Sequence, residues 1–249
     1  MAALKVIPPL SITDSILTSS NVAETDYTAW SSGTTYNIGD RVRYVTTNFH
    51  KVYESLRATN LNHDPTTDTS SPPYWIEVSP TNRWKMFDTS NTTQTTNANT
   101  IVVTLTPGRV VNSVSLLNIE GTSVRVKLTD PVEGVVYDKT VSLNNNGTIN
   151  NWYNYFFNVV TRRTAITLTD LPAYGAGAIE ITITNTGFTA KCGVCILGAV
   201  QYVGEGINLG ASVGIQDYSR KEKDDFGNYQ LIQRSYSKKA KFSMAVLNE

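Results

Sequence analysis

Apolar and polar positions alternate in a series of short runs through the second half of the chain. The segment from Ala178 to Asn185, for example, reads Ala-Ile-Glu-Ile-Thr-Ile-Thr-Asn. A period of two predicts a strand with one face on a core and the other in solvent. Glycine, proline and asparagine separate the runs at the spacing of a jelly-roll sandwich. The predicted strands are Thr100–Leu105, Val110–Ile119, Thr122–Leu128, Val135–Leu143, Ala165–Leu168, Ala178–Asn185 and the apolar run that contains Cys192 and Cys195.

A second pattern, richer in aromatic residues, lies between Trp30 and Trp75. Short half-buried runs include Tyr44 and Tyr53, and turns are expected at a Ser-Ser-Gly sequence and at Gly39-Asp40. We therefore predict a separate small β-unit over residues 25–80.

Composition supports an all-β class. Only 17% of the residues are charged, threonine and asparagine are abundant, and long helical patterns are scarce. The predicted order is an N-terminal arm (1–24), the small aromatic β-unit (25–80), a jelly-roll sandwich (81–203), and a linker with a C-terminal hairpin (204–249). The sandwich, which opens on Trp-Lys-Met-Phe-Asp from Trp84 and carries Ile-Thr-Ile-Thr-Asn near its end, resembles the galactose-binding-like fold.

The small unit resembles the carbohydrate-binding module attached to bacterial chitinases. The resemblance implies a glycan site at Trp30, Tyr36, Tyr53 and Trp75, because a pyranose ring offers an apolar C–H face to an aromatic plane. The alternative is that a unit this small uses its tryptophans as its core, packed on the Pro72-Pro73 corner. The matching positions are Trp30, Tyr36, Gly39, Asp40, Val42, Tyr44, Tyr53, Asn62, Pro65, Tyr74 and Trp75.

The two ends of the chain carry signals of assembly. Residues 2–24 have too few apolar positions to form a face of their own, which predicts an arm or an edge strand. From Gln216 to Lys241 two polar strands flank a turn at Asp225–Asn228, and such a hairpin is marginal alone. We expect neighbouring subunits to bind it, with tentative contacts at Tyr218, Arg220, Phe226, Arg234 and Tyr236.

This C-terminal sequence, with its Asp-Tyr-Ser-Arg-Lys-Glu and Arg-Ser-Tyr-Ser-Lys-Lys blocks, resembles that of tail and baseplate proteins of double-stranded DNA phages. The resemblance implies a structural component of a tail tip or baseplate, located in the virion and in the host cytoplasm before assembly. Other tail proteins are the implied partners, with several copies of this chain in the particle and a contribution to host-surface glycan attachment.

Charge and motifs exclude several other classes. Lysine plus arginine equals aspartate plus glutamate at 21 each, so no global field favours nucleic acid. The N-terminus has no charged and apolar signal pattern, and no apolar run suits membrane insertion.

The cysteines are three apart on a predicted strand, which favours buried free thiols. We expect no cofactor and no metal, because neither His50 nor His63 has a second ligand at metal-site spacing.

Catalysis is not expected either. The chain has no Gly-x-Ser-x-Gly elbow and no phosphate-binding loop, and the carboxylates of Asp40, Glu54 and Glu77 lie in a unit too small for an enclosed cleft. Asp64, before Pro65, is predicted to shape a turn. The leading hypothesis is thus a non-enzymatic virion component. The alternatives are a carbohydrate-binding or receptor-binding module without an assembly role and an accessory subunit of a secreted polysaccharide hydrolase.

Overall fold

A computed structural model describes residues 4–144, 151–157, 161–204, 210–223 and 227–243. The chain divides into two compact units. One comprises residues 7–199 and the other comprises residues 1–6 with 200–249. Among the described residues, no helix is both long and apolar enough to cross a membrane.

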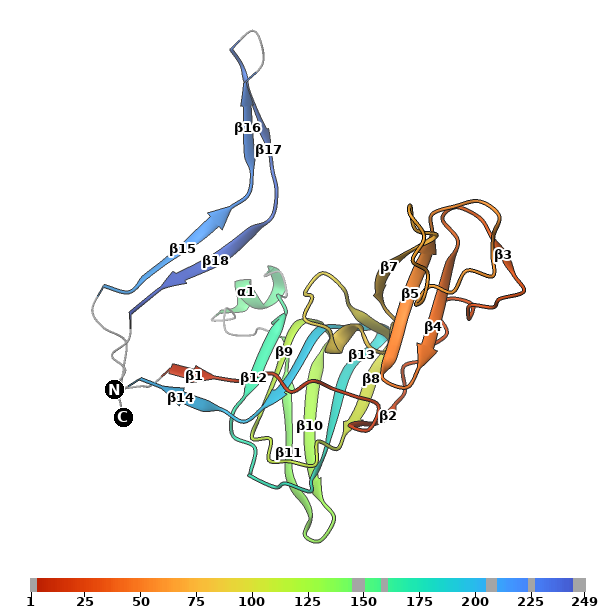
Figure 1. Ribbon diagram of the computed structural model, residues 1–249. Coiled ribbons are helices and arrows are strands. Elements are labelled where there is room, and N and C mark those ends of the chain that lie inside the picture. The colour runs from red at the N-terminus through yellow and green to blue at the C-terminus, as the bar shows by residue number, and fades with distance from the viewer. Residues whose placement is uncertain (1–3, 145–150, 158–160, 205–209, 224–226, 244–249) are drawn as a thin grey trace. The chain divides into compact units, whose positions relative to one another are not determined.

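Seven strands form the large sheet of the first unit, in the order β11-β10-β13-β8-β2, with β9 pairing β13 and β12 (Figure 1). Each register is antiparallel. The strands are β2 (Leu17–Ser20), β8 (Thr95–Leu105), β9 (Ser113–Glu120), β10 (Ser123–Asp130), β11 (Gly134–Ser142), β12 (Ala165–Leu168) and β13 (Ala178–Gly198).

The long strand β13 makes this sheet a sandwich. Its first half lies between β10 and β8, and its second half pairs with β9. The register shifts between Thr184 and Thr189, where the strand changes partners. Buried side chains of both halves, such as Ile181 and Leu197, belong to one core cluster, so the sheet folds over a single core. The all-β prediction is confirmed, and two predicted strands are one continuous strand.

The small aromatic unit has its own sheet, β4-β5-β7, and a short pair, β3-β6. Its core contains Tyr36, Val42, Tyr53 and Trp75, with the ring centroids of Tyr36 and Trp75 5.1 Å apart. Gly39 adopts a φ of 86° in the predicted turn, a backbone conformation that is strained for residues with a side chain. The strands are β3 (Thr35–Tyr36), β4 (Arg41–Thr46), β5 (Phe49–Ser55), β6 (Asn60–Leu61) and β7 (Trp75–Pro80).

The N-terminal segment is already paired within the chain. Strand β2 is an edge of the large sheet, and β1 (Leu4–Val6) pairs with β14 (Gln201–Val203) in the other unit. Parts of residues 2–24 therefore have backbone partners within the chain, and β2 is an edge strand, one of the two forms expected for this segment.

The C-terminal sequence forms two successive two-stranded ribbons instead of one hairpin. In the first, β15 (Ser212–Asp217) pairs with β18 (Tyr236–Lys241), and in the second, β16 (Arg220–Lys223) pairs with β17 (Tyr229–Ile232). Two residues separate β15 from β16 and three separate β17 from β18, so the hydrogen-bond ladder is interrupted between the two ribbons. We call residues 212–241 the C-terminal arm.

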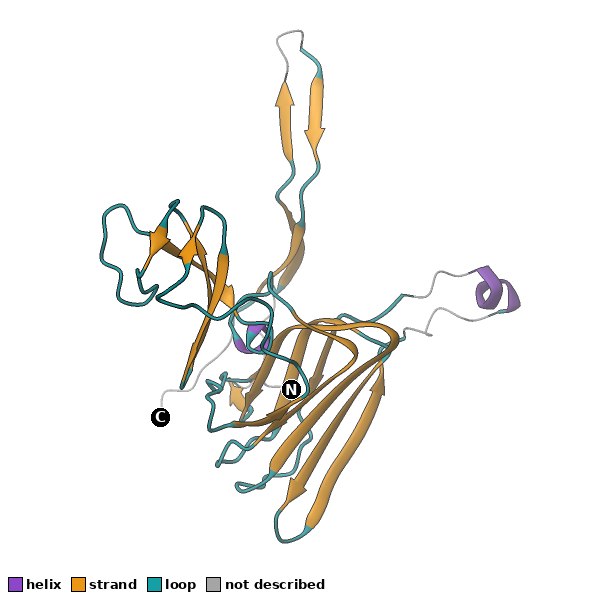
Figure 2. Ribbon diagram, turned by 90° about the vertical axis from the view of Figure 1, so that its right-hand side faces the viewer, coloured by secondary structure: helices purple, strands orange, loops and turns teal. Residues whose placement is uncertain are grey.

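In the part of the chain that the structure describes, helical structure is confined to two short elements. The 3₁₀ turn η1 (Lys85–Phe87) buries Met86 against the sandwich, and α1 (Trp152–Phe157) lies in the connection between β11 and β12 (Figure 2). The aromatic stretch around Trp152 carried no helical prediction. Six residues hold too little periodicity to be distinguished from a strand by pattern alone.

Candidate functional site

Three of the four aromatic residues predicted to bind glycan lie in the core of the small unit. Tyr36, Tyr53 and Trp75 are buried, and burial raises the pKa of the Tyr53 hydroxyl. The indole Nε1 of Trp75 donates to the carbonyl of His63 at 2.8 Å. These rings stabilise the unit, as the alternative interpretation expects. Glycan binding by the set remains a prediction, and contact with a sugar would require ring faces that are covered here.

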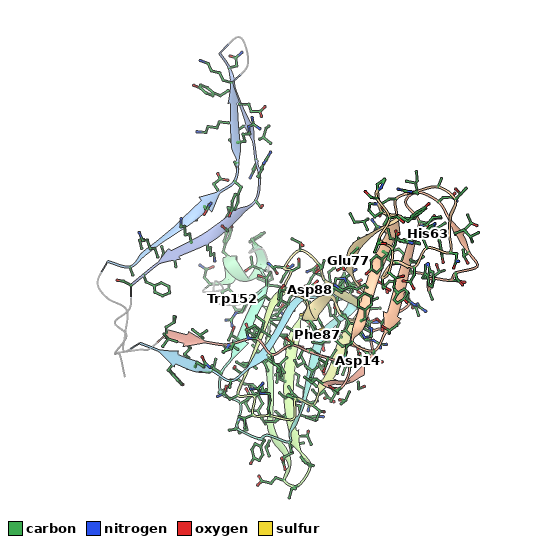
Figure 3. The ribbon with its side chains drawn as sticks, in the orientation of Figure 1. Asp14, His63, Glu77, Phe87, Asp88 and Trp152 are labelled. Carbon is green, nitrogen blue, oxygen red and sulfur yellow. The ribbon has the colours of Figure 1, made fainter. Side chains whose placement is uncertain are left out.

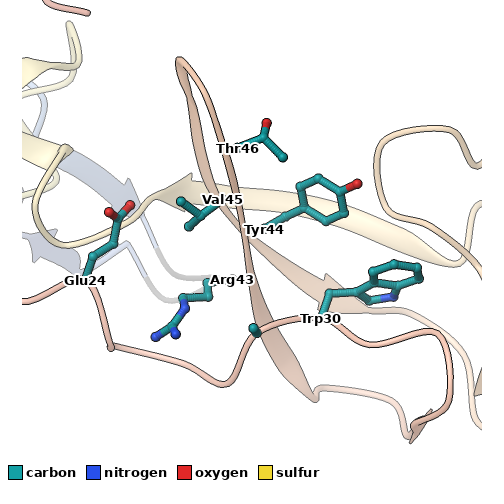
Figure 4. A pocket seen from close by; sticks show the side chains of 7 residues that line it. Glu24, Trp30, Arg43, Tyr44, Val45 and Thr46 are labelled. Carbon is teal, nitrogen blue, oxygen red and sulfur yellow. The ribbon is translucent and has the colours of Figure 1, made fainter. Parts of the chain in front are cut away.

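The fourth residue, Trp30, lines a surface pocket of about 480 Å³. Figure 4 shows Trp30 and Tyr44 toward one end of this pocket, with Arg43 and Glu24 toward the other. The two ring centroids lie 5.9 Å apart and the planes meet at 40°. The remaining lining residues are Ala29, Val45 and Thr46. We call this the Trp30 pocket.

Backbone pairing fixes the position of Trp30. The segment before it runs along β4 as an extra edge, with a parallel bridge between Ala29 and Arg43. The amide of Trp30 donates to the carbonyl of Arg43 at 3.0 Å, and the amide of Arg43 donates to Thr28 at 2.9 Å. These hydrogen bonds fix the backbone at Trp30, so the segment loses little further backbone freedom when a ligand binds.

Tyr44 is fixed from its hydroxyl end. Its hydroxyl donates to Asp64 Oδ2 at 3.1 Å, while Oδ1 accepts from the amide and hydroxyl of Thr66. Asp64 thus shapes the predicted turn. Burial acts to raise the pKa of its carboxyl, but the hydrogen bonds from Thr66 and Tyr44 lower it overall. The ring of Phe49 packs edge-on against that of Tyr44, with the two ring centroids 6.0 Å apart.

The polar groups of the Trp30 pocket differ in whether their hydrogen-bond donors already have acceptors. Arg43 uses Nη1 for the carbonyl of Tyr27 at 3.1 Å, and a guanidinium has five N–H donors in all. Trp30 Nε1 is buried and meets no acceptor within the described part of the chain. The remaining N–H donors of Arg43 suit a ligand rich in acceptor oxygens, whereas the buried Trp30 nitrogen is out of a ligand's reach.

Glu24 connects this pocket to a buried cluster at the junction with the sandwich. Its Oε1 accepts from Thr81 at 2.6 Å and lies 2.7 Å from His50 Nδ1, and its Oε2 lies 3.5 Å from Arg83. His50 Nε2 lies 2.8 Å from Asp14 Oδ1. The imidazole stacks on Trp84 at 4.3 Å.

This cluster joins three parts of the chain. Figure 3 shows Asp14 and Phe87 where the small sheet meets the sandwich, and His63 at the other end of the small sheet. Each ring nitrogen of His50 lies within hydrogen-bonding distance of a carboxyl oxygen, Nδ1 of Glu24 and Nε2 of Asp14. The carboxylate of Glu24 is therefore occupied in holding the junction and is not available to a ligand.

Four of the five residues predicted for assembly lie in the described part of the arm, and Phe226 lies outside the described residues. Tyr218 and Tyr236 are exposed, and Arg220 pairs with Glu222 at 3.0 Å within its own strand. The amide of Arg234 donates to Ser219 Oγ at 3.1 Å, close to where the two ribbons join. Their roles in assembly remain predictions.

The two cysteines are buried free thiols on β13. Burial raises the pKa of Cys192 to about 12 and raises that of Cys195 well above its usual value. Neither thiol is therefore set up as a thiolate nucleophile at neutral pH. Within the described ranges, no group of three or more His, Cys, Asp or Glu side chains is placed to hold a metal ion.

Sequence reasoning missed Tyr44 and Arg43 as pocket residues. Tyr44 stood among the positions that match the chitinase-type module, but nothing in the local pattern distinguishes it from the buried Tyr53. Alternation along β4 would not have found the pair either, because it places Arg43 and Tyr44 on opposite faces of the pleat.

No protein-family model and no curated protein matches the chain. Two solved structures are similar to part of it, both of chitosan-binding module 1 from a chitosanase/glucanase of Paenibacillus sp. IK-5. One, a selenomethionine-labelled point mutant, is 16% identical, covers 47% of this chain and 83% of its own, and has a TM-score of 0.31. The other is 17% identical, with coverage of 45% and 81% and a TM-score of 0.30. These values describe weak similarity.

Proposed function

We propose that the protein is a non-catalytic structural component of a multi-protein assembly and that its C-terminal arm binds a neighbouring subunit. The assembly we propose is the tail tip or baseplate of a phage, on the resemblance of the C-terminal sequence to such proteins. The chain would then be present in several copies in the virion tail, with other tail proteins as its partners.

The observation that carries this proposal is a set of exposed apolar side chains on one face of the first ribbon of the arm. Side chains alternate along a strand, and the register sets Val213 opposite Ala240, Ile215 opposite Lys238 and Asp217 opposite Tyr236, all on the same face. Val213 is 85% exposed and Ile215 69% exposed. The opposite face carries Ser212, Gly214, Gln216, Ser237, Lys239 and Lys241. A two-stranded ribbon with exposed apolar side chains is marginal alone and gains stability when a partner covers them.

We predict that the double variant Val213→Ser, Ile215→Ser will enter the assembly poorly. Each side chain should contribute about 1 kcal/mol when covered, so affinity should fall by about 30-fold. The measurement is the amount of protein in purified particles by immunoblot, in a host that supplies the variant in place of the natural chain. Lys239→Ser on the opposite face is the control. Equal incorporation of the double variant and the control would contradict the proposal.

The Trp30 pocket favours a second function, attachment to a glycan. Trp30 and Tyr44 offer aromatic surface to the C–H face of a sugar, and Arg43 can donate to its oxygens. One pocket of this size would bind weakly, so attachment would depend on several copies acting together. This function is compatible with an assembly role, and it stands alone if the chain works as a receptor-binding module.

Arg43→Gln tests this function with little disturbance of the fold. We expect the affinity measured by affinity electrophoresis to fall by at least about tenfold for a polysaccharide that binds, because a charge-assisted hydrogen bond contributes about 1.5–3 kcal/mol. The probes are glycol chitin, hydroxyethyl cellulose and the purified surface polysaccharide of the host. Arg41→Gln is matched, since Arg41 is on the same strand but pairs with Glu54 and does not line the pocket. Retardation that both variants leave unchanged would count against glycan binding here.

A further inference from the structure

Helix α1 presents an exposed aromatic surface that neither proposed function uses. Its sequence is Trp-Tyr-Asn-Tyr-Phe-Phe, and Trp152, Tyr153, Phe156 and Phe157 are 79%, 70%, 68% and 70% exposed. Residues four apart are neighbours on a helix, and the rings pair accordingly. The centroids of Trp152 and Phe156 are 6.3 Å apart, and those of Tyr153 and Phe157 are 4.9 Å apart. The two pairs are adjacent stripes of one aromatic face.

The sequence around this face is free of charge. No lysine, arginine, histidine, aspartate or glutamate occurs from Thr140 to Thr161, a stretch that ends at the consecutive basic residues Arg162 and Arg163. The Arg162 guanidinium donates to Asn185 at 3.2 Å, and the amide of Arg163 donates to the carbonyl of Leu143 at 2.7 Å. The two arginines are thus tied to the sandwich where the connection returns to it.

We propose that α1 is a lipid-contacting tip that enters the interface of an anionic bilayer, with Arg162 and Arg163 beside the headgroup phosphates. Tryptophan and tyrosine rings favour the headgroup level of a membrane, where one end is apolar and the other is wet. A charged side chain would oppose burial in that layer, and this stretch carries none. The proposed contact is with the headgroup layer of the membrane, and the helix does not cross the bilayer.

The area of the face argues for lipid over a second protein. Four aromatic side chains, each about 70% exposed, offer roughly 550 Å². A stable protein interface buries about 800 Å² on each partner and is rimmed by polar and charged groups. A small uncharged aromatic tip that a basic pair follows in the sequence fits instead the pattern of a peripheral membrane contact, in which apolar insertion and electrostatic attraction act together.

Vesicle flotation of the full chain tests this proposal. The protein should float with vesicles of phosphatidylcholine and phosphatidylglycerol, and less with phosphatidylcholine alone. Trp152→Ser with Phe157→Ser should lower the apparent affinity by at least about tenfold, because two large apolar side chains are lost. Arg163→Gln should lower it by about fivefold for the anionic vesicles only. Unchanged thermal midpoints would show that both variants fold, as expected for exposed rings.

Phe188→Ser is the matched control, since Phe188 is as exposed as the rings of α1 but belongs to β13 of the sandwich. It should float as the parent does. The proposal is wrong if the parent floats with neither kind of vesicle, or if the double variant floats as well as Phe188→Ser. Loss of particle incorporation by the same double variant, without any lipid binding by the parent, would instead assign the aromatic face to a protein partner.

Discussion

Replacing His50 by alanine should lower the free energy of unfolding by about 3 kcal/mol, the largest effect we expect from one substitution. The side chain is only 10% exposed and lies between two carboxylates, and Glu24 is similarly buried. Removing the imidazole leaves those carboxylates without their shared partner and removes the stack on Trp84. Because these groups come from three parts of the chain, the loss should weaken the attachment of the small unit to the sandwich.

Urea unfolding measures this effect, and the second histidine provides the comparison. His63 stacks on Tyr74 at 3.5 Å but has no carboxylate at hydrogen-bonding distance among the ion pairs of the described residues. His63→Ala should therefore cost about 1 kcal/mol, the usual contribution of a stacked pair. If His50→Ala destabilises the protein no more than His63→Ala does, the cluster is not what holds the junction.

Gly198→Ala should lower the free energy of unfolding by about 2 kcal/mol. At this position the N-terminal segment crosses the end of β13, where the amide of Leu10 donates to Leu197 at 2.8 Å. A Cβ on Gly198 would overlap the carbonyl oxygen of Pro8 and lie 2.9 Å from Ile7 Cγ2. Backbone atoms cannot move aside as the end of a flexible side chain can, so the segment must shift and lose part of its packing.

Gly175→Ala is the control for this prediction, measured in the same urea titration. A Cβ there would meet Val110 Cγ2 at 3.8 Å, an ordinary contact, and the stability should change by less than about 0.5 kcal/mol. A Gly198→Ala protein as stable as the Gly175→Ala protein would mean that the N-terminal segment does not pack closely on β13.

The sequence by itself determined the all-β class and the positions of several strands and turns. These features follow from local rules that act over a few residues. The alternation from Ala178 to Asn185 could only describe a strand, Gly39 marked a turn that needs positive φ, and Asp64 before Pro65 marked a turn that its carboxylate completes. The pairing of two polar strands near the C-terminus was also legible, although the interruption that divides it into two ribbons was not.

Only the tertiary structure decided which aromatic residues are buried and which line a pocket. Trp30 and Trp75 are equivalent in the sequence pattern, yet Trp75 lies in the core and Trp30 at a surface pocket. The His50 cluster likewise joins residues that are 26 and 36 positions from it in the chain. The physical reason is that burial and ligand geometry are set by contacts between distant segments, whereas residue type and spacing report only the preferences of each segment by itself.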